Sequence, residues 1–438
     1  MYKKKRLLMK DKEIMDKDKE FFIQGYARVP LVLVEGKGTI LKDINGKEYI
    51  DCFAGIAVSN VGHAHERLVR VANEQMSKLI HTSGRFFNIP QTLLVEKLAE
   101  ITPDKLKHTY LCNSGTEAVE NAVKLVKKYA FSRGKLGAAL IAIECSFHGR
   151  LGYSLSLTGQ AKYKKGFGTY ANAPGVVHVP VPYSYRSKFT EEECGIESAL
   201  AVEKTIDRQT AGDVAAFIME PILGEGGIIV PPDTYYETLT KILKERDIPL
   251  IIDEVQSGFG RTGRWFAIEH WNLKPDLITM AKGMGGGMPI GAVIATSEIA
   301  NSVESGDFFS TYGGNPVCSS VAMENIAILK DEKLIENSEK IGRIFFKGLN
   351  DLQEKYPIIG DIRGKGLMIG IELVKDPKKK TPASDEAKKL VNYFMDKGVI
   401  IGLGGIHVNV LRLQPPLCIT EEQAIIVLEK FNQGLKNL

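Results

Sequence analysis

The sequence has no long apolar run and almost no excess of charge of either sign. No stretch approaches the roughly 18 consecutive apolar residues of a transmembrane helix, so we expect no membrane span. The 57 basic and 53 acidic residues leave a net charge of +4, and the two signs are interleaved, which argues against a nucleic-acid or membrane partner. With 44% hydrophobic and 25% charged residues, the composition excludes a disordered, collagen-like or coiled-coil chain.

Paired cysteines and targeting signals are missing as well. The six cysteines stand singly, which is typical of a reduced cytosolic enzyme, so we expect a cytoplasmic protein. In residues 1–20 the only apolar run is Leu7-Leu8-Met9, too short for the core of a signal peptide. Acidic residues there also argue against a transit peptide, and we expect a disordered or helical tail.

Glycine, in contrast, is in excess, and its 43 copies often stand in clusters between short apolar runs. From about residue 66 to 328 these runs alternate with helical patterns, which predicts a parallel sheet covered by helices on both faces. The predicted strands are Tyr110–Cys112, Leu140–Ile143, Val214–Met219, Leu250–Ile252, Leu277–Met280 and Ala292–Ala295.

Both ends of the chain have a different pattern of predicted strands and helices. Residues 31–50 predict a short β unit with a turn at Asn45-Gly46, a strong hairpin signal. Beyond about residue 329, strand-like segments mix with helices, including a last helix that begins at the capping box of Thr420 and Gln423. We therefore expect an α/β fold with an N-terminal segment (1–65) that joins a small α+β domain (329–438), and a large domain (66–328) between them.

Polar residues follow nearly every predicted strand of the large domain, at the edge where open parallel sheets bind ligands. The segment Asn113-Ser114-Gly115-Thr116-Glu117 opens a helix, and the free N–H groups of a helix start can bind a phosphate. A plain capping box is the alternative there. Phe147-His148-Gly149 could stack on a flat ring or pack on the core.

Charged groups end two further strands. Asp253 and Glu254 end an apolar run, and partly desolvated acids need a partner, either a cationic ring nitrogen or a nearby arginine. Lys282 directly follows another apolar run and precedes a glycine-rich segment, as if a bulky ligand passed close by. Desolvation lowers the pKa of such a lysine, which suits a Schiff-base amine.

Two other patterns point to sites that the context does not support. Gly258–Gly263 matches G-x-G-x-x-G with Asp276 at a suitable distance, but no helical pattern follows it, so we do not expect a dinucleotide site. His63-Ala64-His65-Glu66 has no second cluster to complete a metal site, and we favour turn and capping roles.

Taken in order, these segments resemble the class III pyridoxal-phosphate aminotransferases, the ornithine and 4-aminobutyrate group. The resemblance runs from about Pro30 to the C-terminus. The matching segments are 114–118, 147–150, Glu220-Pro221 with 224–226, 253–263, 281–283, 311–316 and Leu411-Arg412. It implies fold type I with a small domain built from both chain ends, pyridoxal 5′-phosphate as cofactor, and a homodimer, or a dimer of dimers, with shared active sites.

The resemblance also implies roles for the residues around the cofactor. Lys282 would hold the cofactor as a Schiff base and then act as the base, and Asp253 would keep the pyridine nitrogen protonated. Gln256 would hydrogen-bond the phenolic oxygen of the cofactor, and Val255 and Phe147 would sandwich its ring. The remaining expected cofactor ligands are His148, Glu220, Ser114, Gly115 and Thr116, with Thr311 of the partner subunit at the phosphate.

For the substrates, the resemblance points to two arginines. Arg150 would hold the carboxylate of an ω-amino donor, and Arg412 the α-carboxylate of the 2-oxoacid, because arginine binds carboxylates bidentately. Glu225 would pair with Arg412 when that arginine is unused, and Ile56 would narrow the pocket. The implied reaction moves an amino group from an ω-amino donor, first of all 4-aminobutyrate, to 2-oxoglutarate.

Three alternatives stay open. The same cofactor segments occur in ornithine and acetylornithine aminotransferases and in amino-acid racemases and epimerases of the family. Leu151 and Leu223 stand where threonine and glutamine are usual, close to the expected substrate. A noncatalytic protein that binds the cofactor is the alternative from another class, although it would have no need of Lys282, Asp253 and both arginines.

Overall fold

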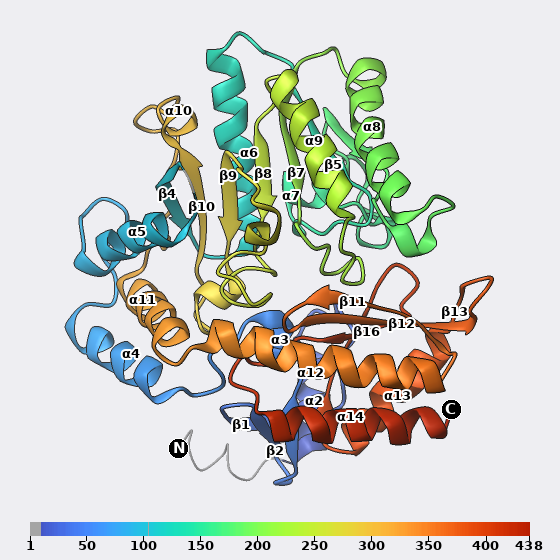
Figure 1. The fold of residues 1–438 in the computed structure, drawn as a ribbon. Helices are drawn as coiled ribbons and strands as arrows, with labels where there is room; N and C mark the ends of the chain where they lie inside the picture. Colours follow the sequence, from blue (N-terminus) through green and yellow to red (C-terminus); the bar gives the residue numbers. More distant parts are fainter. Residues whose placement is uncertain (1–9, 104) are drawn as a thin grey trace.

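The computed structural model describes residues 10–103 and 105–438. A seven-stranded sheet in the order β4-β10-β9-β8-β7-β5-β6 forms the upper part of the molecule (Figure 1). Only β10 runs antiparallel to its neighbours, so the sheet is mostly parallel, as predicted. The strands are β4 (Leu106–Cys112), β5 (Ala139–Ile143), β6 (Val176–Val179), β7 (Val214–Met219), β8 (Leu250–Asp253), β9 (Leu277–Met280) and β10 (Gly291–Thr296).

Helices cover both faces of this sheet because alternate strand residues face opposite sides. Ile218 and Ile251 belong to the apolar cluster formed with α6 (Gly115–Ser132). Their neighbours Phe217 and Ile252 belong to the cluster that contains residues of α8 (Glu191–Gln209) and α9 (Asp233–Glu245). The remaining α-helices of this part are α4 (Glu66–Lys78), α5 (Ile89–Ile101), α7 (Gly152–Leu157), α10 (Ser297–Ala300) and α11 (Pro316–Asp331).

The N-terminal strands join the C-terminal part of the chain. The order of their sheet is β1-β2-β3-β14, and β3 pairs in parallel with β14 (Val399–Ile400). The predicted turn at Asn45-Gly46 lies between β2 and β3, and Gly46 has φ 86°, which favours glycine. The N-terminal elements are α2 (Asp11–Phe21), β1 (Leu33–Lys37), β2 (Ile40–Asp43), β3 (Glu48–Asp51) and α3 (Ala54–Ala57). Part of the tail predicted for residues 1–20 lies outside the described residues.

An antiparallel sheet in the order β11-β12-β16-β15 forms the lower part, with α12 and α14 side by side (Figure 1). The predicted capping box of Thr420 and Gln423 starts α14. The domain limits stay predictions; the limit at 328/329 falls within α11. The elements are α12 (Leu334–Lys355), β11 (Ile359–Lys365), β12 (Met368–Asp376), β13 (Thr381–Pro382), α13 (Ser384–Asp396), β15 (Gly402–Gly404), β16 (Val410–Leu413) and α14 (Glu421–Lys436).

The two disfavoured patterns have other roles in the fold. The G-x-G-x-x-G run opens no α-helix; its Arg261 is fully buried and donates to Asn60 Oδ1 (2.6 Å), Leu367 O (3.1 Å) and Pro415 O (2.5 Å). His63 pairs with Asp51 at 2.7 Å, and His65 caps α4. Within residues 10–103 and 105–438, no group of three or more histidine, cysteine or acidic side chains is placed to hold a metal ion. No helix in this part of the chain has the length and apolarity to cross a membrane.

Candidate active site

The predicted cofactor residues meet around one cavity of about 390 Å³ at the carboxyl ends of the parallel strands. A larger groove of about 750 Å³ lies near the start of β8 and β9, and none of the predicted site residues is among those that line it. The chemistry is therefore concentrated at the edge expected for an open α/β sheet. The predicted residues that line the cavity are Ser114, Gly115, Thr116, Phe147, His148, Glu220, Asp253, Val255, Gln256 and Lys282.

The start of α6 forms one wall of the cavity. Ser114 Oγ caps the helix by accepting a hydrogen bond from the N–H of Glu117 at 3.2 Å. A Cβ atom on Gly115 would lie 2.7 Å from Cγ1 of Val255, so this close approach requires glycine. The first turn can thus both cap itself and bind an anion through its free N–H groups.

Asp253 and His148 form a buried pair beside this wall. Asp253 ends β8, and its Oδ2 lies 2.8 Å from Nδ1 of His148, while its Oδ1 accepts the N–H of Val255 at 3.1 Å. The carboxylate therefore pairs with a histidine, and the predicted alternative of an arginine partner is wrong. His148 Nε2 is buried and has no hydrogen-bond partner within the described part of the chain.

Lys282 reaches the cavity from the turn after β9. Burial lowers the pKa of its amine, opposed by the charges of Glu225, Asp253 and Glu220. The residue has φ 41°, a left-handed conformation that is uncommon outside glycine. Asn325 holds the turn that follows by donating to Gly283 O at 2.8 Å. A desolvated amine in a fixed position is what nucleophilic lysine chemistry requires.

Glu220 organises the backbone of two neighbouring loops at the cavity. Its carboxylate accepts the N–H groups of Phe147 and Gly224, each at 2.8 Å. Burial raises the pKa of Glu220 to about 7. Gln256 accepts a hydrogen bond from Nε2 of Gln414 at 3.1 Å. The contacts of Glu220 connect two of the predicted segments directly.

The ion pair predicted for the substrate side is present. Arg412 NH1 lies 2.6 Å from Glu225 Oε1, and the side chain of Arg412 is only 4% exposed. Burial alone would raise the pKa of Glu225, but the charge and hydrogen bond of Arg412 outweigh burial and lower it. Nε of Arg412 has no partner among the described residues. Glu225 thus neutralises the charge of Arg412 but leaves one of its hydrogen-bond donors unused.

Arg150 lies at the edge of the site on two aromatic rings. Its guanidinium is 4.2 Å from the ring centroid of Tyr163 and 5.5 Å from that of Phe147. Sequence reasoning missed Tyr163 and the neighbouring Lys162, whose pKa burial lowers while Glu225 raises it. The only signal was a cluster of lysines around Tyr163, which is equally typical of a solvated loop.

Ile56 lies in a strained turn. Four consecutive residues, 54–57, have positive φ, with Gly55 at 62° and Ile56 at 69°. Such a left-handed turn costs about 1–2 kcal/mol for each residue other than glycine. Asp51 holds it by accepting the N–H groups of Phe53 (2.9 Å) and Ala54 (2.8 Å). Strain maintained in this way is typical of functional sites.

Seven residues predicted near cofactor or substrate do not line the cavity of their own chain: Ile56, Arg150, Leu151, Leu223, Glu225, Thr311 and Arg412. Thr311 is exposed, so its expected role in the partner subunit stays a prediction. Leu223 is fully buried in the core, and Leu151 is exposed. The unusual leucines therefore do not alter the wall of this cavity.

A model of the family "Aminotransferase class-III" matches residues 21–435. The chain belongs to this family. It is 40% identical to the acetylornithine aminotransferase of Methanocaldococcus jannaschii, over 97% of this chain and 98% of that protein. It is 38% identical to the leucine/methionine racemase of Thermococcus litoralis, over 96% of both. An omega transaminase from Pseudomonas jessenii, solved in complex with PMP, has a TM-score of 0.92 at 30% identity, covering 96% of this chain and 97% of that one.

The resemblance and fold predicted from the sequence are thus confirmed, and the protein is a pyridoxal-phosphate-dependent transaminase. The cavity fits the cofactor on its own features. The start of α6 offers N–H groups where a Cβ on Gly115 would collide with Val255, and no described residue is a partner for His148 Nε2. Lys282 supplies an amine with a lowered pKa. We propose that the ten cavity-lining residues named above hold the cofactor.

Glu254, next to Asp253, provides a test of how burial acts on carboxylates in this aminotransferase. It is fully buried, accepts from Ser257 Oγ and Ile268 N, and burial raises its pKa from 4.5 to about 7. The folded state therefore holds this proton more tightly than the unfolded state, so its contribution to stability falls as pH rises from about 4.5 through 7.

We expect Glu254→Gln to remove this dependence. Relative to wild type, the variant should gain up to roughly 3 kcal/mol between pH 4.5 and 8, since one pKa unit is about 1.4 kcal/mol. The measurement is thermal unfolding of the holoenzyme across this pH range, with Glu237→Gln at an exposed acid as control. An unchanged pH profile for Glu254→Gln would show that Glu254 titrates normally.

Proposed function

We propose that this aminotransferase moves an amino group from an ω-amino donor, first of all 4-aminobutyrate, to 2-oxoglutarate by a ping-pong mechanism. The observation that carries the proposal is the 2.6 Å ion pair of Glu225 and Arg412. An ω-amino donor has no carboxylate beside its reacting amine, and a bare buried arginine would be costly. Glu225 neutralises Arg412 in this half-reaction and must move away when the α-carboxylate of 2-oxoglutarate arrives.

Arg150 is proposed to hold the distal carboxylate in both half-reactions. It stands on the rings of Phe147 and Tyr163, and Phe147 lines the cofactor cavity. A planar guanidinium supported on a ring keeps its donors free for a carboxylate. Ile56, held in its strained turn, is proposed to limit the width of the pocket.

N-acetylornithine is the second donor to test. Relatives with 36–40% identity carry the printed name acetylornithine aminotransferase. The δ-amine of N-acetylornithine also has no neighbouring carboxylate, so the argument from the ion pair applies to it equally. A screen of donors and 2-oxoacid acceptors with the purified holoenzyme ranks the two.

Racemisation is the alternative suggested by the leucine/methionine racemase among the relatives. An α-amino acid carries a carboxylate beside the reacting amine and would need Arg412 free of Glu225. The ion pair therefore favours the transamination of ω-amines. Accumulation of an oxoacid from the donor supports transamination, whereas return of the opposite enantiomer without oxoacid supports racemisation.

Each residue at the cavity is proposed to have its own role in the reaction. When bound, pyridoxal phosphate supplies an electron sink for the substrate carbon that loses its proton. Lys282 Nζ is proposed to hold and move that proton, since burial lowers its pKa. Asp253, fixed by His148, places negative charge at the end of β8. Val255 and Phe147 are proposed to hold the ring between them, and Gln256 its phenolic oxygen.

The ion pair can be tested by separating the half-reactions in single turnovers that follow the cofactor spectrum. Glu225→Ser should weaken the half-reaction with 4-aminobutyrate about tenfold or more and favour glutamate as donor, because Arg412 is then uncovered. Arg412→Ala should impair the 2-oxoglutarate step far more than the donor step. Equal losses in both steps for both variants would show that the pair is only structural.

A second copy of the chain is proposed to complete the site. Segments near residues 80 and 312 lie together, since Asn315 Nδ2 donates to Ile80 O at 2.8 Å and the rings of His81 and Tyr312 are 5.2 Å apart. Exposed apolar side chains gather on these segments, and exposed apolar surface of this kind marks protein contacts. They are Met76, Leu79, Ile80, Phe86, Phe87, Ile89, Leu93, Phe309 and Tyr312. Sedimentation equilibrium of the holoenzyme tests whether the 48.3 kDa chain pairs, which would bring Thr311 to the partner's phosphate site.

A further inference from the structure

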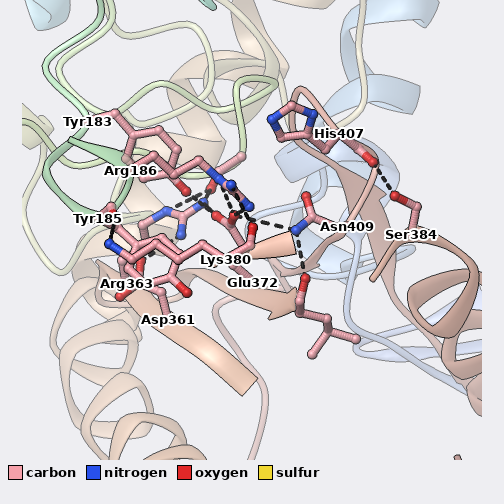
Figure 2. Close-up of polar contacts among 12 residues, drawn as sticks. Tyr183, Tyr185, Arg186, Asp361, Arg363, Glu372, Lys380, Ser384, His407 and Asn409 are labelled. Carbon is pink, nitrogen blue, oxygen red and sulfur yellow. Dashed lines mark hydrogen bonds and ion pairs between the residues drawn. The ribbon is translucent and has the colours of Figure 1, made fainter. Parts of the chain in front are cut away.

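A buried polar network connects the lower sheet to the loop that carries Glu225. Figure 2 shows its centre, where Arg363 of β11 and Arg186 approach Glu372 of β12 from different directions. Arg363 NH2 lies 2.9 Å from Glu372 Oε2, and Arg186 Nε donates to Glu372 Oε1 at 2.7 Å. Tyr183 Oη also donates to this carboxylate.

The charges in this network stabilise one another. Burial alone would raise the pKa of Glu372, but Arg363, Tyr183 and Arg186 outweigh burial and lower it. Arg363 also donates to Asp361 at 2.7 Å, so two carboxylates balance two guanidinium groups. A buried and balanced set of this kind holds the planar guanidinium of Arg363 in one orientation.

The other edge of Arg363 contacts the backbone two and three residues after Glu225. Nε donates to the carbonyls of Gly227 and Ile228, each at 3.1 Å, and NH2 donates to Gly227 O at 2.6 Å. Glu225 is followed by Gly226 and Gly227, and Gly227 has φ 114°. The N–H groups of Gly227 and Ile228 both donate to Gly224 O at 3.2 Å, which closes the turn around Glu225, and Arg363 fixes this closed turn to the lower sheet.

We propose that Arg363 is a positioning residue that sets where Glu225 stands against Arg412, and so sets the balance between ω-amino donors and dicarboxylate acceptors. The proposal rests on the function proposed above. Arg363 does not line the cofactor cavity, and it acts through the Gly227 and Ile228 carbonyls. Without this anchor, Glu225 covers Arg412 less well, and Arg412 is more available to an incoming carboxylate.

The chain offers a matched pair of substitutions. Arg363→Lys and Arg186→Lys both replace an arginine that binds Glu372, and both keep the charge. Only Arg363 contacts the Gly227 and Ile228 carbonyls, and a lysine cannot reproduce the planar fork that reaches both. Arg363→Gln, which keeps a donor without the charge, is the second variant if the first fails to fold. Thermal unfolding of each holoenzyme reports folding.

Two readouts test the proposal. Single-turnover rates should show the 4-aminobutyrate half-reaction weakened about tenfold relative to the 2-oxoglutarate half-reaction in Arg363→Lys, in the direction of Glu225→Ser. Calorimetry should show that glutarate, a dicarboxylate without amino or oxo group, binds Arg363→Lys severalfold more tightly than wild type. Arg186→Lys should leave both the ratio of half-reactions and glutarate binding within about twofold of wild type.

The possible failures are distinguishable. If Glu225→Ser shifts the ratio and glutarate affinity but Arg363→Lys shifts them no more than Arg186→Lys, Arg363 has no positioning role and only this proposal is overturned. If Glu225→Ser itself changes neither quantity, the ion pair does not select substrates, and the proposed function and the role of Arg363 both fall.

Discussion

Replacing Lys282 by alanine is expected to reduce turnover by at least about 10⁴-fold, because the group that moves the proton is lost. The structure places this amine at the cavity, with a pKa that burial lowers. Wild-type holoenzyme should be yellow and lose visible absorbance when an amino donor is added. Borohydride reduction followed by peptide mass mapping should locate the cofactor on Lys282.

The matched control is Lys164→Ala. Burial also lowers the pKa of Lys164, but its Nζ donates to Ser156 O at 2.7 Å and it does not line the cavity. This variant should keep its turnover and its label. A label on any lysine other than Lys282, or turnover near that of wild type in Lys282→Ala, would contradict the assignment.

Replacing Asp253 by asparagine is expected to leave the cofactor bound yet reduce turnover about 100-fold or more. An amide cannot balance a positive charge as the carboxylate does, and each pKa unit of lost stabilisation corresponds to about tenfold in rate. The contacts of the Asp253 carboxylate with His148 Nδ1 and with the N–H of Val255 hold it in place, so an amide of the same shape should fit. Steady-state kinetics and the absorbance of bound cofactor measure the two effects.

The control for Asp253→Asn is Glu254→Gln, which removes a buried acid that lies outside the cavity. Glu254 is the next residue, is fully buried, and does not line the cavity. Its variant should therefore keep turnover near that of wild type while changing the pH dependence of stability. Equal losses of activity in Asp253→Asn and Glu254→Gln would show that the strand end is needed only for packing.

Much of the large domain follows from local pattern. Val214–Met219 and Leu277–Met280 are strands with the predicted bounds, because a continuous apolar run can be buried on both faces only in the interior of a sheet. β6 (Val176–Val179) was missed, since its partly exposed residues include His178 and break the apolar signal. β11 was missed for the same reason, as most of its residues are only partly buried.

The location of the cofactor site could also be predicted from the sequence alone. Strand ends bring Ser114, Asp253 and Lys282 to one sheet edge whatever the details of packing, because parallel strands share a carboxyl edge. The order and spacing of the segments around them then specified the family. The side-chain partner of Asp253 was left open, and the structure shows His148 where an arginine was the alternative.

What tertiary structure alone decided are contacts between segments far apart in the chain. β3 pairs with β14, although the two strands stand near opposite ends of the chain. The hydrogen bonds of Arg363 to the carbonyls after Glu225 have no local signal, since the two segments lie far apart in the sequence and meet only in the folded protein. Hydrophobic period and turn chemistry act over a few residues, whereas hydrogen bonds to backbone carbonyls can join any two segments that the fold brings together.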